Sequence, residues 1–117
     1  MAHDQALADR VRRVLAGRPD IEEKRMVGGV SFSVDGRMCC GVSSRALVVR
    51  VGADAREPML RLPDVRPMVL GGKVVTGFVL VDPDGVSTDR DLEAWIQRGL
   101  DFASALPRPA RRPKQAR

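Results

Sequence analysis

The chain has 117 residues, of which 44% are hydrophobic and 30% charged, and its formal net charge is +5. This length and composition predict one globular domain with a single core and exclude an intrinsically disordered chain. No run of about 18 apolar residues occurs, so we expect no membrane span. The mixed charges near the N-terminus are unlike those of a signal peptide, so we expect a cytoplasmic protein with two free thiols.

The first predicted element is an amphipathic helix over residues 4–16. Asp4 is a suitable N-cap, and Gly17 followed by Pro19 ends the helical pattern. The apolar residues of this segment recur at helical spacing: Leu7, Val11, Val14 and Leu15. We therefore expect a helix that covers the core with one face.

Alternation of apolar and polar residues next predicts strands with one buried face. Three strands, around residues 30–34, 38–42 and 47–51, form an antiparallel meander. Asp35-Gly36 between the first two is a two-residue hairpin signal. The charged run 22–25, just before them, is expected to be solvated surface.

Residues 52–63 predict a connection with a short helical piece that has Pro58 in its first turn. Strands at 67–70 and 74–82 follow on either side of a Gly71-Gly72 turn, and the Asp-Pro-Asp-Gly at 82–85 is a further turn.

The last predicted helix spans residues 88–106, with Thr88 as N-cap and Trp95 as its expected anchor on the sheet. Its apolar stripe is continuous: Leu92, Trp95, Ile96, Gly99, Leu100, Ala103 and Leu106. Together these elements predict an α+β fold in two layers, an antiparallel sheet of about five strands with N- and C-terminal helices packed against it.

The excess positive charge lies at the C-terminus. Residues 108–117 contain five basic residues and no acidic one: Arg108, Arg111, Arg112, Lys114 and Arg117. The other 15 of the 20 basic residues balance the 15 acidic residues. We divide the chain into a domain at 1–107 and a basic, mobile tail at 108–117. We interpret the tail as a solubilising terminus, and weak, sequence-independent contact with nucleic acid is the alternative.

Features that suggest catalysis have simpler explanations. Gly28-Gly29 lies beside a basic pair but lacks the spacing of a phosphate-binding loop, so we interpret it as a bend in the sheet. Neighbouring cysteines on a strand point to opposite faces, so Cys39 and Cys40 are expected to be packing thiols. His3 is the only histidine. We therefore expect no enzyme, no cofactor and no metal site.

Several short segments, taken together, resemble the N-terminal domain of the TfoX/Sxy family of competence regulators. The residues at matching positions are Arg25, Met26, Gly28, Gly29, Asp35, Gly36, Met38, Leu47, Arg50 and Pro67. The resemblance covers roughly residues 4 to 106. It implies a two-layer α+β domain, and a regulatory or interaction module with no associated catalytic residues.

Four positions depart from the family pattern by lacking its aromatic residues: Val27, Cys39, Val48 and Met68. Two interpretations are open. Exposed aromatics in relatives would mean a weakened contact surface here, whereas internal aromatics would mean a core packed with different side chains.

The sequence thus predicts a non-enzymatic regulatory module that binds another protein, of unknown identity, with a second copy of the chain as one candidate. An uncovered edge of the predicted sheet is the expected pairing surface. The alternative is weak nucleic-acid association through the basic tail.

Overall fold

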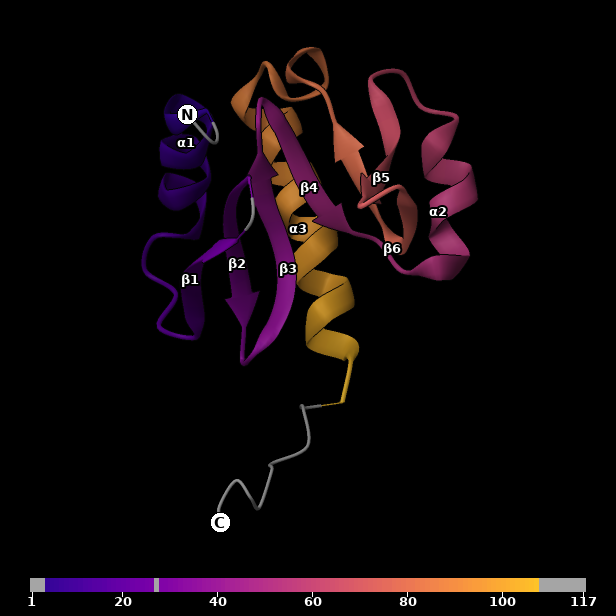
Figure 1. The fold of residues 1–117 in the computed structure, drawn as a ribbon. Helices are drawn as coiled ribbons and strands as arrows, with labels where there is room; N and C mark the ends of the chain where they lie inside the picture. The colour runs from indigo at the N-terminus through magenta and orange to yellow at the C-terminus, as the bar shows by residue number, and fades with distance from the viewer. Residues whose placement is uncertain (1–3, 27, 108–117) are drawn as a thin grey trace.

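The computed structural model describes residues 4–26 and 28–107, and it contains an open six-stranded antiparallel sheet and three α-helices (Figure 1). The elements in chain order are α1 (Gln5–Leu15), β1 (Ile21–Met26), β2 (Gly29–Val34), β3 (Arg37–Ser43), β4 (Ala46–Arg50), α2 (Ala53–Leu60), β5 (Val65–Leu70), β6 (Lys73–Val81), the 3-10 turn η1 (Pro83–Val86) and α3 (Asp89–Ala105). The predicted α+β class is confirmed.

The strands lie in the order β1-β2-β3-β4-β6-β5, so the predicted meander is present as β2, β3 and β4. Helix α2 carries the chain past one strand position to β5, and β6 returns between β4 and β5. The strand beyond the expected number is β1, which contains the run 22–25. The run is exposed, as predicted, but the sequence analysis missed the strand, because four consecutive charges show no apolar alternation.

All three helices pack on one face of the sheet. Buried side chains of α1 and α3 join those of β2, β3, β4 and β6 in one hydrophobic core, and α2 adds half-buried residues to the same core. Figure 1 shows α3 running behind the central strands. The predicted two-layer arrangement is therefore present, and none of the helices in residues 4–26 and 28–107 lies on the opposite face of the sheet.

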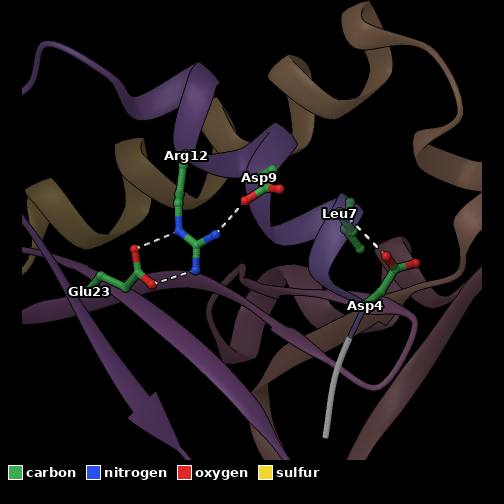
Figure 2. Close-up of polar contacts among 5 residues, drawn as sticks. All are labelled: Asp4, Leu7, Asp9, Arg12 and Glu23. Carbon is green, nitrogen blue, oxygen red and sulfur yellow. Dashed lines mark hydrogen bonds and ion pairs between the residues drawn. The ribbon is translucent and has the colours of Figure 1, made fainter. Parts of the chain in front are cut away.

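The helix caps follow the sequence signals. The backbone N–H of Leu7 donates to Asp4 Oδ1 at 3.1 Å, at the start of α1 (Figure 2). The N–H of Asp91 donates to Thr88 Oγ1 at 3.0 Å, at the start of α3. Each side chain satisfies one backbone donor that the first helical turn leaves without a partner.

No helix in the described part of the chain is long and apolar enough to cross a bilayer.

Two details of the helices differ from the sequence predictions. Pro58 lies near the C-terminal end of α2 instead of in its first turn. Trp95 is half-buried at the margin of the core, with the Arg98 guanidinium 5.6 Å from its ring centroid. Fully buried residues such as Leu92 and Ile96 anchor α3 instead, because they lie nearer the centre of its apolar stripe.

The tight turns have the predicted backbone. Asp35 and Gly36 both have positive φ, at 51° and 82°, as a two-residue hairpin turn requires. Gly71 and Gly72 do the same at the β5–β6 hairpin, with φ of 57° and 80°. These residues set the register of the strands that they connect.

A bulge in β3 changes the direction of the two cysteines. Phe32 pairs with Cys40 and Ser33 pairs with Met38, which leaves Cys39 as an extra residue in the strand. Both cysteines are fully buried, and their Sγ atoms lie 3.8 Å apart. The prediction that they point to opposite faces was wrong, because a bulge interrupts the alternation of side chains.

Helix α3 lies directly against this bulge. A Cβ placed on Gly99 would lie 2.3 Å from the carbonyl oxygen of Cys39, so no larger residue fits there without a shift of the helix. A glycine inside a helix normally weakens it by about 1 kcal/mol relative to alanine. Close packing between helix and strand accounts for its presence at this position.

We predict that Gly99→Ala destabilises the domain although it raises helix propensity. The clash with the strand backbone should cost about 3 kcal/mol and outweigh the propensity gain of about 1 kcal/mol. Chemical denaturation would measure the change in the free energy of unfolding. The control is Ser104→Ala, an exposed position of α3, which should be neutral or slightly stabilising. A more stable Gly99→Ala variant would contradict the packing account.

Candidate interaction surface

The Gly28-Gly29 pair shapes the turn between β1 and β2. Gly28 has φ of 76°, which favours glycine. Gly29 pairs with Met26, and a Cβ placed on it would lie 1.8 Å from the carbonyl oxygen of Val42 on β3. Both glycines therefore serve the backbone geometry of the sheet, as the interpretation of the pair as a bend expects.

The cysteines lie inside the core and form no disulfide. The thiol of Cys39 lies 3.3 Å from the carbonyl oxygen of Phe32. The hydrogen bond with Cys39 and the burial of the thiol together raise the pKa of Cys40 well above its ordinary value. The same hydrogen bond lowers the pKa of Cys39. Only the Cys40 thiol is therefore held in the protonated, weakly nucleophilic form, and both thiols are buried in the core.

Two methionines of the family pattern meet on the helix-free face. The methyl carbons of Met38 and Met26 would lie 3.1 and 3.3 Å from a Cβ placed on Gly41. Gly41 thus leaves room for two flexible side chains to converge over β3.

The other residues named by the resemblance are spread over the sheet. Arg50 donates to the carbonyl oxygen of Met38 at 3.4 Å, and its guanidinium lies 5.4 and 5.9 Å from the rings of Phe78 and Phe102. Arg25 lies on β1 and Pro67 on β5, at opposite ends of the strand order. The structure therefore brings Met26 and Met38 together but does not gather the whole set into one site.

The Asp35-Gly36 hairpin is joined to the end of α3. Arg37 is buried, donates to the carbonyl oxygens of Val34 and Leu106, and lies 3.5 Å from the carboxylate of Asp35. This arginine fastens the hairpin to the last turn of the helix.

The basic residues predicted to contact nucleic acid lie outside the described residues: Arg108, Arg111, Arg112, Lys114 and Arg117.

The positions that lack the family aromatics are largely internal. Cys39 and Val48 are fully buried, and Met68 is 6% exposed. This favours the interpretation of a core packed with different side chains over that of a weakened contact surface. Val27 lies outside the described residues.

One edge of the sheet is interrupted by proline. The N–H of Asp82 donates to the carbonyl oxygen of Asp64 at 2.7 Å, so Asp64 faces β6. By alternation Arg66 also faces β6, and Pro67 presents its nitrogen to the free side of β5. Proline lacks the N–H that an added strand would need, so this edge resists pairing.

The β1 edge has no such interruption. Asp20 and Lys24 turn their carbonyl oxygens toward β2, where they accept from Asp35 N at 3.1 Å and Ser31 Oγ at 3.4 Å. By alternation Ile21, Glu23 and Arg25 present their N–H and C=O groups to the outer side. β1 is the terminal strand of the sheet, so this side continues no ladder within the described residues.

The side chains of β1 carry mixed charge on both faces. On the helix side, Glu23 accepts from Arg12 Nε at 2.9 Å and Nη2 at 2.7 Å, and Asp9 accepts from Arg12 Nη1 at 2.6 Å (Figure 2). These carboxylates raise the pKa of Arg12, with the hydrogen bond to Glu23 as the largest cause. On the opposite face, Lys24 Nζ lies 3.9 Å from Glu22.

A shallow recess of about 580 Å³ lies between the β3–β4 turn and η1. Arg66 and Asp82 line this recess, and Arg66 Nε and Nη2 donate to the Asp82 carboxylate at 3.0 and 2.7 Å. This hydrogen bond lowers the pKa of Asp82. The carboxylate and the guanidinium neutralise each other, and no cluster of potential metal ligands occurs in the described ranges.

Residues 13–103 match the family model of the TfoX N-terminal domain. No curated protein and no solved structure matches the chain.

We predict that Asp82→Asn lowers the free energy of unfolding by about 0.5 kcal/mol at neutral pH, a typical value for an exposed ion pair. The folded state lowers the pKa of Asp82, so the pair stabilises above the unfolded pKa of about 3.9. The difference between the two proteins should shrink as the pH falls through the folded pKa. Denaturation at several pH values would measure it, and a difference that grows in acid would contradict the assignment.

Proposed function

Because the chain belongs to the TfoX N-terminal domain family, we propose that it is a non-enzymatic regulatory module that acts by binding another protein. The family relates it to regulators of competence. Binding takes place by addition of a partner strand at the β1 edge. The two free cysteines suit a reducing compartment, and we propose the cytoplasm.

The observation that carries this proposal is the contrast between the two edges. Ile21, Glu23 and Arg25 offer backbone donors and acceptors on the outer side of β1, whereas Pro67 interrupts the free side of β5. Strand addition uses main-chain hydrogen bonds for affinity and side chains for selectivity. Mixed charges on β1 supply that selectivity, since they repel strands of the wrong charge pattern.

We predict that Arg25→Pro abolishes capture of the partner, because the proline removes an outward N–H without removing a hydrogen bond to β2. The measurement is a crosslinked pulldown from native lysate with the variant and the wild-type chain as baits. Arg25→Ala is the matched control, since it removes the side chain and keeps the N–H. Equal capture by Arg25→Pro and wild type, with both baits folded by circular dichroism, would exclude the β1 edge.

A second candidate function is weak association with nucleic acid. All of the excess positive charge lies in residues 108–117, and the remaining chain is formally neutral. Five basic residues without aromatics would contact phosphates but would not select bases.

Deletion of residues 108–117 should abolish any binding of the chain to a duplex DNA of arbitrary sequence. Binding by the full chain should fall steeply between about 50 and 200 mM salt, because each neutralised phosphate releases a counterion. Fluorescence anisotropy at several salt concentrations would measure both effects. Affinity that survives the deletion would exclude the tail as the contact.

A further inference from the structure

We propose that the strand added at the β1 edge is β1 of a second copy of this chain, in antiparallel register with Glu23 opposite Glu23. This inference rests on the proposed function and names its partner. The paired copies share one continuous sheet built from the six strands of each.

The geometry of the edge restricts the register. In an antiparallel ladder, residues directly opposite each other point to the same face. A two-fold axis perpendicular to the sheet keeps the helices of both copies on the same side of the shared sheet. Each residue must therefore pair with a residue whose side chain points to the same face. Ile21, Glu23 and Arg25 of β1 alternate with Glu22, Lys24 and Met26, so the axis must pass through a residue and not between two residues.

Centring the axis on Glu23 uses every outward backbone group of the strand. Glu23 then forms a hydrogen-bonded pair with Glu23 of the second copy. On each side of this central pair, Ile21 of one copy forms a hydrogen-bonded pair with Arg25 of the other. Centring it on Lys24 would leave Ile21 without a partner residue on β1 and would set two lysine ammonium groups opposite each other. The first register therefore makes more ladder hydrogen bonds and avoids that repulsion.

The charges complement each other in this register. On the helix-free face, Glu22 of each copy lies opposite Lys24 of the other, so one contact of opposite charges occurs twice. On the helix face, each Glu23 carboxylate is bound by both Nε and Nη2 of its own Arg12, which offsets the meeting of two carboxylates at the axis (Figure 2). Arg25 lies diagonal to Glu23 of the second copy, within reach of a long side chain.

The expected association is weak. A single pair of short strands buries less than the roughly 1,200 Å² at the lower end of stable interfaces. Its charged pairs are exposed and therefore screened by salt. We expect a dimer that forms as the protein concentration rises and dissociates as the ionic strength rises.

The test is sedimentation velocity of the full chain over a range of concentrations, with two single charge reversals and their combination. Glu22→Lys and Lys24→Glu should each weaken association about tenfold or more, because each reversal places like charges opposite each other twice. The double variant Glu22→Lys/Lys24→Glu exchanges the two charges and should restore association to near the wild-type level. Glu57→Lys on α2 is the control for net charge and should leave association unchanged.

A wild-type chain that keeps the mass of one copy at every concentration would overturn the inference. So would a dimer that the single reversals leave unchanged, or one that the double variant fails to restore while remaining folded. As a second measurement, Glu23→Cys should form a disulfide between copies under mild oxidation, because hydrogen-bonded pairs hold their Cα atoms about 5.5 Å apart. Glu57→Cys should not.

The proposed function fails in a different way. A monomeric chain whose capture of a lysate protein is abolished by Arg25→Pro would keep strand addition at β1 and would exclude only the second copy as partner. A different result would be a dimer that the charge reversals weaken but that Arg25→Pro leaves unchanged. In that case the side chains of β1, and not its backbone groups, would make the contact between the copies.

Discussion

The contact between Gly99 of α3 and the carbonyl of Cys39 on β3 is the constraint on which the rest of the arrangement depends. It seats the longest helix directly on the middle of the sheet, where α1 packs beside it and α2 covers the β6 end. With the three helices of the described residues on this face, none of these helices covers the other face. The terminal strand β1 is then held by β2 and by the ion pair from Arg12.

Much of this fold could be predicted from local patterns. Asp4 and Thr88 cap their helices as expected, and Asp35-Gly36 forms the expected hairpin, because these features depend on a few neighbouring residues. β1 could not be recognised in the same way, since its central residues are all charged and its strand character comes from pairing with β2. The orientation of Cys39 depends on a register shift between strands, which the sequence of β3 alone does not reveal.

The candidate site was predictable in part. The family pattern pointed to Arg25 and Met26 on β1 and to Pro67 on β5, but it did not indicate that these residues lie on opposite edges. The two edges differ in which residues turn their backbone N–H and C=O groups outward. These residues are set by how each edge strand pairs with its neighbour, which the sequence of the strand alone does not show. The signal that the sequence did contain was two acidic residues followed by two basic residues, Glu22 to Arg25, in a segment that ends in a glycine turn.

Pro67 has a consequence for how far such a sheet could grow. A sheet with two receptive sides can accept strands at both ends, and repeated addition of that kind leads to fibres. Here any strand accepted at β1 would leave an assembly whose remaining β5 edge is interrupted by Pro67, which has no amide hydrogen. Pro67 would thus oppose growth at the β5 edge, and a second copy joined at β1 would give a dimer whose two outer edges resist further pairing.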